Sequence, residues 1–384
     1  MSADFSIFWL WRTIVEVPVP SEAAIRFYRS GRWLWLGATL WSLAIPWLVH
    51  RLRLGERWQA WTERARVPKT LLPCGVFALF TTLTFALDLP WAYWVGYARS
   101  HAYGLSVQTP SKWARDLVTS FAIELFLGMV AAWVFFFLLR RLPRFWWAAL
   151  AALTVPVSAA LIYLAPLVID PLFNDFHPLQ NVELQRRVLD LTERAGLDGS
   201  RIFEVAKSVD TTAVNAYVTG FAGSHRVVLW DTLLAKLDER EILAVVAHEA
   251  GHYVLGHVAL GILLSGLGAL AILFLVDRGV RRLLPDATAR IAPASLPTWV
   301  LAISLVSLLG QPVGLAISRH FEHQADRFAL DLTRDNDAVA GAFTELQRNN
   351  LSYPRPERWV VWLRASHPPL AERIEFANQY VPTR

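Results

Sequence analysis

Six long apolar stretches separated by polar segments dominate the pattern of hydrophobic and polar positions along the chain. Each has about 17–25 residues with few charges, enough for a helix that crosses about 30 Å of hydrocarbon. We therefore expect a polytopic helical membrane protein, mainly α. The predicted spans are 33–49, 70–91, 117–139, 145–169, 254–276 and 297–317.

Two polar segments interrupt this pattern. The first, 170–251, predicts an amphipathic helix at 182–195, and then short β-rich runs at 201–205, 215–219 and 226–230. Gly220 and Gly223 lie between the last two runs, which indicates a hairpin or adjacent strands. A further helix begins near Asp238. The second segment, 318–384, predicts helices around 321–332 and 337–349 and a short one near its end.

These segments define two domains. Residues 1–169 form an N-terminal membrane domain with four spans. Residues 170–384 form a second domain with a small β-sheet, interrupted by two spans at about 254–276 and 297–317.

Composition supports a membrane protein. Hydrophobic residues make up 54% of the chain and charged residues 18%, against about 25% charged in soluble proteins. Many of the 18 tryptophans lie near the ends of apolar runs, as interfacial anchors do. The single cysteine, Cys74, excludes an internal disulfide and a thiolate metal cluster. Residues 5–11 are too short to span and lack the features of a signal peptide.

The net charge of +5 comes with basic residues in short loops between spans. This placement favours anionic lipid headgroups over nucleic acid, so we expect membrane lipids as partners and no nucleic acid. The positive-inside rule makes the face carrying these loops cytoplasmic. The loop residues are Arg51, Arg53, Arg57, Arg64, Arg66, Lys69, Arg140, Arg141, Arg144, Arg278, Arg281, Arg282 and Arg290.

The string His248-Glu249-Ala250-Gly251-His252 carries the chemistry. Residues i and i+4 of a helix share a face about 6 Å apart, so both imidazoles can reach one ion. Glu249 occupies the neighbouring position, where it can take a proton from metal-bound water. Two histidines, a carboxylate and a water form a catalytic zinc site with one open position.

The third ligand is expected in the segment that follows the sixth span. Glu322 and Asp326 are i and i+4, which permits Glu322 as the ligand and Asp326 as an acceptor for a ligand histidine's N–H. His320 or His323 could instead be the ligand, and spacing does not choose among them. His257, five residues after His252, points elsewhere on a continuous helix and is read as a boundary residue. His225 receives no role.

Five motifs follow one another between Pro171 and Pro369. They are Pro171-Leu172-Phe173-Asn174; Asn215-Ala216-Tyr217 with 227–234; His248 to His252; Phe321-Glu322-His323-Gln324-Ala325-Asp326; and Ser366-His367-Pro368-Pro369. Together they resemble the integral-membrane zinc metalloproteases related to type I CAAX prenyl proteases and HtpX-like bacterial proteases. More weakly, Leu89-Pro90 and 103–109 resemble the N-terminal membrane half of the CAAX type, which HtpX-like proteins lack, so the CAAX type is the closer match.

The resemblance implies one zinc ion per chain with Glu322 as the third ligand. It places His367 and Arg373 near the zinc, where a cation could stabilise the oxyanion of the tetrahedral intermediate. It makes Asn215 and Ala216 part of an edge strand that holds a substrate backbone by β-augmentation. The implied fold is a chamber of about six transmembrane helices capped by a gluzincin-type zinc protease domain.

The implied activity is that of a membrane-embedded zinc metalloendopeptidase. It would hydrolyse peptide bonds of membrane-associated, and in the CAAX case lipid-modified, substrates with Glu249 as general base. A general quality-control protease is the alternative in this class, and a non-catalytic zinc-binding scaffold is the alternative outside it. The family's zinc domain opens to the cytosol, opposite to the side that the positive-inside rule gives. The Ala-, Arg- and Trp-rich composition suits a bacterial cytoplasmic (inner) membrane.

Overall fold

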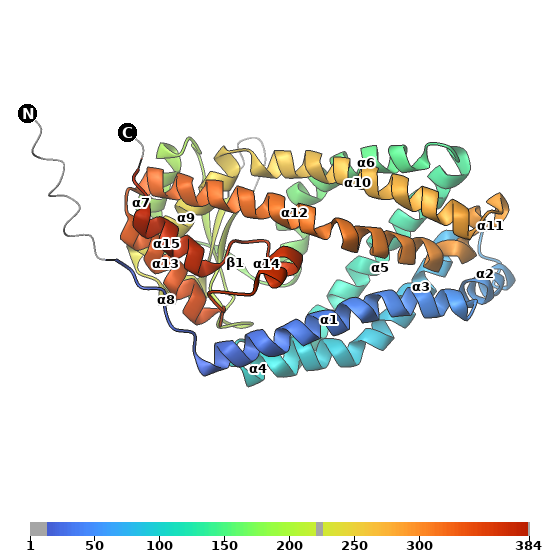
Figure 1. The fold of residues 1–384 in the computed structure, drawn as a ribbon, viewed down its shortest axis with the longest axis horizontal. Helices are drawn as coiled ribbons and strands as arrows, with labels where there is room; N and C mark the ends of the chain where they lie inside the picture. Colours follow the sequence, from blue (N-terminus) through green and yellow to red (C-terminus); the bar gives the residue numbers. More distant parts are fainter. Residues whose placement is uncertain (1–13, 220–225, 383–384) are drawn as a thin grey trace, which may run out of the picture. The chain divides into compact units, whose positions relative to one another are not determined.

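The computed structural model describes residues 14–219 and 226–382 (Figure 1). The predictions made for residues 5–11, Gly220, Gly223 and His225 lie outside these ranges. The described residues divide into two compact units. Unit 1 comprises residues 14–29, 174–219, 226–258 and 313–382, and unit 2 comprises residues 30–173 and 259–312.

Long helices supply the residues of unit 2. Their bounds are α1 Glu22–Arg51, α3 Leu72–Trp91, α5 Pro110–Arg141, α6 Trp146–Leu164, α10 His257–Leu283 and α12 Leu296–Thr333, with the shorter α2 Leu54–Arg64, α4 Arg99–Ala102 and α11 Ala287–Ile291. Short π-helical turns continue α3 and α6. Helices α1, α10 and α12 also contribute residues to unit 1.

Five helical stretches among the described residues are long and apolar enough to cross a membrane, and they overlap five of the six predicted spans, with starts that differ by up to three residues in three of them. The remaining predicted span, 33–49, is helical within α1, but α1 is not one of the five. Four tryptophans and Pro46 lower its mean hydropathy, and tryptophan favours the interface over the hydrocarbon. The five stretches are Leu72–Ala102, Pro110–Arg141, Trp146–Leu172, His257–Leu283 and Pro293–Thr333. The prediction of a mainly helical, polytopic membrane protein with a small sheet is confirmed.

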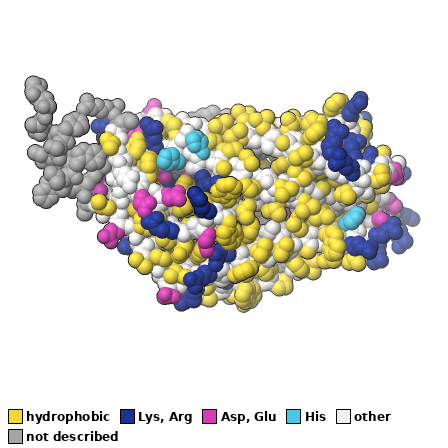
Figure 2. Space-filling view, viewed as in Figure 1, with side chains coloured by type: hydrophobic (Ala, Val, Ile, Leu, Met, Phe, Trp, Pro, Cys, Tyr) yellow, Lys and Arg dark blue, Asp and Glu magenta, His cyan; other side chains and the backbone are white. Residues whose placement is uncertain are grey.

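Aromatic side chains form the centre of unit 2. Trp146 and Trp299 are fully buried, and their rings meet edge to face with centroids 5.1 Å apart. The Trp146 indole N–H donates to the carboxylate of buried Asp277, which also accepts from Arg281. Outside this core, hydrophobic side chains cover the long helices of unit 2, and Lys and Arg gather at the end that carries α2 and α11 (Figure 2). That pattern fits helices in lipid with a basic rim at headgroup depth.

The expectation that His257 lies on a continuation of the helix that carries His252 is wrong. Helix α9, Glu239–Val254, ends before α10 begins at His257, and Leu255 and Gly256 separate them. Gly256 has φ +69°, a left-handed conformation that ends helices and that glycine adopts without steric cost.

Unit 1 contains a four-stranded sheet with strand order β1-β2-β4-β3. The strands are β1 Phe176–Pro178, β2 Arg201–Val205, β3 Ala216–Thr219 and β4 Arg226–Trp230. Strands β2 and β4 are parallel, and β3 pairs antiparallel with β4, with Ala216 opposite Leu229. The three predicted strands and the adjacency of the last two are confirmed, whereas β1 was not predicted. Strand β3 lies at an edge of the sheet.

Helices pack around this sheet in unit 1, and helix α9 contacts α7, α13 and β3. The start of α9 is a capping box, in which Asp238 accepts from the Glu241 N–H and the Glu241 carboxylate accepts from the Asp238 N–H. This local signal explains why the helix start was predictable. The other helices of unit 1 are α7 Val182–Arg194, α8 Asp231–Lys236, α13 Asn336–Asn349, α14 Arg358–Arg364 and α15 Leu370–Gln379.

Candidate metal centre and active site

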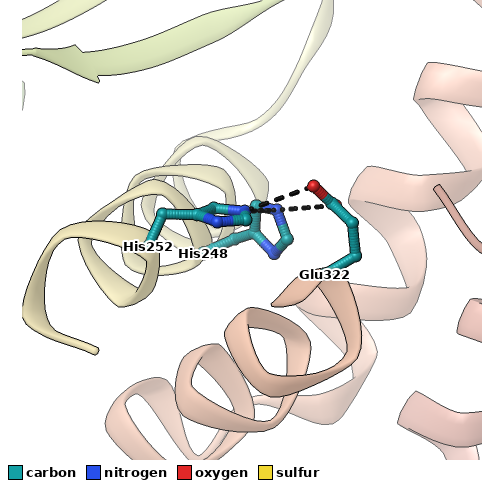
Figure 3. A group of neighbouring side chains, drawn as sticks. All are labelled: His248, His252 and Glu322. Carbon is teal, nitrogen blue, oxygen red and sulfur yellow. Dashed lines mark hydrogen bonds and ion pairs between the residues drawn. The ribbon is translucent and has the colours of Figure 1, made fainter. Parts of the chain in front are cut away.

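Two histidines from α9 and one carboxylate from α12 converge in unit 1 (Figure 3). The Nε2 atoms of His248 and His252 are 3.2 Å apart, and they lie 3.3 and 3.4 Å from the two carboxylate oxygens of Glu322. In a tetrahedral zinc site with metal–ligand bonds of about 2.0–2.1 Å, ligand atoms are about 3.3 Å apart. The three side chains therefore have the spacing that one such ion requires.

Small residues let the two helices approach closely enough for this convergence. A Cβ added to Gly251 would lie 3.1 Å from Cδ1 of Phe328 and 3.3 Å from Cα of Ala325. Ala325 itself is fully buried. The glycine between the two histidines therefore brings the backbone of α9 against α12 at the level of Glu322.

The carboxylates around His248 favour a positive charge at the site formed by His248, His252 and Glu322. Burial by itself lowers the pKa of the His248 imidazole, but the carboxylates of Asp326 and Glu322 outweigh it and raise this pKa to about 9. One carboxylate oxygen of Glu322, Oε2, is buried without a hydrogen-bond partner. An orphaned buried oxygen and a cation-stabilising pocket both fit a metal ion.

Asp326 lies on the side of His248 away from the other ligands. Its Oδ1 is 2.9 Å from Nδ1 of His248, and its two oxygens accept from Nε and Nη2 of Arg373 at 2.8 and 2.5 Å. The Arg373 guanidinium is buried and lies over the ring of Phe343 at 4.0 Å. Asp326 thus joins a ligand histidine to a buried cation.

The other histidines of the 318–326 segment lie apart from the ligand group. His320 is exposed, and the ring of His323 packs against Phe376 with centroids 4.5 Å apart. The group that could hold a metal is completed by Glu322 alone among the three candidates for third ligand.

A pocket of about 500 Å³ opens beside the ligand group. His248, Glu249, His367 and Arg373 form its polar wall, and burial raises the pKa of the Glu249 carboxyl. Apolar side chains form much of the remaining lining. They include those of Val245, Val339, Ala342, Phe343, Leu346 and Leu370.

His367 and Arg373 differ in their freedom to reach a substrate. His367 is 58% exposed, and its Nε2 lies 3.3 Å from Oε1 of Glu322. Its Nδ1 is 2.8 Å from the Ser366 hydroxyl. The Arg373 guanidinium is held by Asp326, with Nη2 also 3.6 Å from Oε2 of Glu322. An exposed imidazole and a buried cation therefore flank Glu322.

The predicted substrate-binding residues lie at the beginning of the edge strand. Asn215 lines the pocket, and Ala216 is the first residue of β3. The Trp230 N–H donates to the Asn215 carbonyl, so the alternation of an antiparallel pair turns the N–H and C=O of Ala216 and Val218 away from β4. In the part of the chain that the structure describes, no strand pairs with this outer edge.

Two residues at the site, Asn350 and His257, had no signal in the sequence. Asn350 lines the pocket and makes two hydrogen bonds to the backbone of Val214, just before β3. Nδ1 of His257, which was read as a boundary residue, is 3.1 Å from Nδ1 of His252. Both contacts join residues of different elements, and the spacing of residues within one helix or strand does not predict such contacts.

Comparisons with known proteins agree with this geometry. A family model described as peptidase family M48 matches residues 178–381, and one described as CAAX prenyl protease N-terminal, five membrane helices, matches residues 29–175. Within that second range the structure has four helices of 19 residues or more, α1, α3, α5 and α6.

Relatives match most of the chain. The uncharacterized metalloprotease YhfN of Bacillus subtilis is 36% identical over 85% of this chain and 78% of its own length. CAAX prenyl protease 1 of Saccharomyces cerevisiae is 29% identical over 77% of this chain and 70% of its own. The crystal structure of S. mikatae Ste24p has the same fold, with a TM-score of 0.81 at 24% identity, covering 95% of this chain and 91% of that one.

Proposed function

Because the chain belongs to peptidase family M48 and is a multi-pass membrane metalloprotease, we propose that its metal is zinc and that it cuts peptides attached to the membrane by a lipid. The observation that carries the proposal is the convergence of His248, His252 and Glu322 beside Glu249 and a pocket. Membership of a peptidase family, together with this constellation, weighs against the non-catalytic scaffold.

The donor set supports zinc. Two imidazoles and one carboxylate at 3.2–3.4 Å from one another are the ligands of catalytic zinc sites, which keep a fourth position open. When bound, zinc would supply a Lewis acid that polarises a carbonyl and lowers the pKa of water. His248 and His252 would hold it through Nε2 and Glu322 through its carboxylate.

Glu249 acts as the general base. Glu249 lines the pocket next to the ligands, and burial raises the pKa of its carboxyl above the usual value, which makes it a stronger base for a proton of water. It takes the proton of the attacking water and delivers it to the leaving amine.

His367 and Arg373 have different parts in the proposal. The exposed His367 lies beside Glu322, where its N–H can donate to the oxyanion that forms on the scissile carbonyl. Arg373 acts mainly through Asp326, which accepts from Nδ1 of His248 and so presents Nε2 to the metal.

The substrate backbone pairs with the outer edge of β3 beside Asn215 and Ala216. The apolar part of the pocket lining then receives an apolar side chain next to the cleaved bond. Relatives named CAAX prenyl proteases point to C-terminal CAAX peptides that carry a prenyl group. In this proposal membrane lipids surround the spans. Residues 1–169 serve as a membrane domain and residues 170–384 as the protease domain. The proposed location is a bacterial cytoplasmic membrane.

The test compares cleavage, in detergent, of a prenylated CAAX peptide with cleavage of the identical peptide without the prenyl group. Glu249→Gln protein serves as the blank. Faster cleavage of the prenylated peptide is the expected result. Equal cleavage of both would contradict lipid selection and favour a general quality-control protease. No cleavage above the blank, by protein shown to hold zinc, would contradict the CAAX proposal.

A further inference from the structure

His257 contacts the metal centre although it belongs to another helix. It is the first residue of α10, it is only 6% exposed, and its Nδ1 lies 3.1 Å from Nδ1 of His252. On a continuous helix a residue five positions after His252 would point about 140° away from it. The left-handed turn at Gly256 instead returns the chain so that the two rings meet, with centroids 5.2 Å apart.

The protons in this contact can be assigned. His252 turns Nε2 toward His248 and Glu322, and a nitrogen that binds a metal carries no proton. The proton of His252 is therefore on Nδ1, which donates to Nδ1 of His257. Nδ1 of His257 must then be unprotonated, so that this neutral imidazole carries its proton on Nε2.

Gln324 completes the chain of hydrogen bonds. Its side-chain oxygen lies 3.0 Å from Nε2 of His257 and accepts that proton. The ring of His257 also stacks on Phe321 with centroids 4.4 Å apart and planes within 5°. Phe321 and Gln324 flank Glu322 on α12, so the segment that supplies the third ligand also holds His257.

We propose that His257 is a positioning residue, a neutral acceptor that fixes the tautomer and the ring orientation of the ligand His252. The inference rests on the proposed zinc site and extends it. The two ligand histidines are supported differently, since His248 faces the carboxylate of Asp326 and His252 faces an uncharged imidazole. A neutral partner orients the ligand without adding another negative charge beside Glu322.

The experiment measures zinc affinity of the full chain in detergent, by competition with a chromophoric chelator at fixed pH. His257→Phe keeps the ring and its stacking on Phe321 but removes both hydrogen bonds. Loss of such a supporting partner should weaken zinc binding by about 10–100-fold. His257→Asn places an acceptor oxygen near the position of Nδ1, and it should restore affinity to within about threefold of the wild-type value.

Two further variants complete the design. Gln324→Leu removes the oxygen that accepts from Nε2 of His257 and should also lower zinc affinity. This variant replaces His257→Phe in the experiment if His257→Phe does not fold. His101→Phe is the matched control, because His101 also makes two hydrogen bonds, to the carbonyls of Tyr97 and Gln108, in unit 2. Its zinc affinity should equal that of the wild type.

A second readout separates positioning from packing. The visible spectrum of the Co²⁺-loaded protein reports ligand geometry and should change in His257→Phe and return in His257→Asn. Equal zinc affinity in His257→Phe and wild type would overturn the inference while leaving the zinc site intact. A wild-type chain that binds no zinc would instead overturn the proposed function, and this inference with it.

Discussion

At the scale of the residue, two glutamates of the same site have different surroundings and different proposed tasks. The carboxylate oxygens of Glu322 lie 3.3–3.4 Å from imidazole nitrogens of His248, His252 and His367, so this side chain is placed to share a metal ion with histidines. Glu249 lines the pocket instead, and burial raises its carboxyl pKa. The first is suited to binding the metal and the second to moving a proton.

Substituting the two glutamates should separate these tasks. Glu249→Gln should lower kcat by about 10²–10⁴-fold, the contribution of a general base, while zinc content stays at one ion per chain. Glu322→Gln should lose zinc as well as activity. Cleavage rates and metal analysis of the same preparations check this, and a Glu249→Gln protein without zinc would contradict the assignment.

The pair of Asp326 and Arg373 is a second residue-scale feature, because both side chains are buried. Asp326→Ala leaves the Arg373 charge without its carboxylate partner. Breaking one side of a buried pair should lower the free energy of unfolding by about 3–5 kcal/mol, and zinc affinity should fall with it. Glu372→Ala removes a neighbouring exposed carboxylate and is the control. Denaturant unfolding of the two variants makes the comparison, and equal stabilities would refute the role of the pair.

At the scale of the element, the metal centre depends on the approach of α9 to α12. Gly251→Val would place a branched side chain where even a Cβ lies 3.1 Å from Phe328. The helices should separate, with a loss of about 1–3 kcal/mol of stability from overpacking and a loss of zinc binding. Gly261→Val, on α10 with no neighbour within 4 Å, is the matched control. Thermal unfolding and zinc titration test the pair, and the expectation fails if Gly251→Val binds zinc normally.

The outer edge of β3, with which no strand pairs among the described residues, carries another element-scale prediction. Val218→Pro removes an outward N–H without touching a hydrogen bond to β4. One lost backbone hydrogen bond of about 0.5–1.5 kcal/mol corresponds to a decrease in kcat/KM of about 2–12-fold. Val218→Ala keeps the N–H and should cleave peptides at the wild-type rate. A proline variant with unchanged kcat/KM and zinc content would exclude substrate pairing at this position.

Several elements were predictable because their signals are local. Strands β2 and β4 have the predicted bounds, and the start of α9 follows from a capping box within four residues. The break at Leu255 and Gly256 was not predicted. An apolar helix pattern continues on both sides of it, and a single glycine is tolerated inside many helices.

At the scale of the whole molecule, metal binding should stabilise the folded chain. Zinc that binds only the folded state at 100 times its Kd adds about 2.7 kcal/mol to the free energy of unfolding. The melting temperature should therefore rise with added zinc and fall with a chelator, whereas the Glu322→Gln variant should show neither shift. Thermal unfolding at several zinc concentrations decides this, and equal shifts in both proteins would place the zinc elsewhere.

Local patterns were enough for five of the six predicted spans, for strands β2, β3 and β4, and for the pair His248 and His252, because hydrocarbon thickness and the helical repeat act over short stretches of chain. Glu322, the proposed third ligand, lies 70 residues after His252, so spacing left Glu322, His320 and His323 as alternatives. Only the packing of α12 against Gly251 brings Glu322 to the histidines, and only the turn at Gly256 brings His257 to His252. These contacts join surfaces of separate elements, and their formation depends on side-chain volumes that meet only in the folded chain.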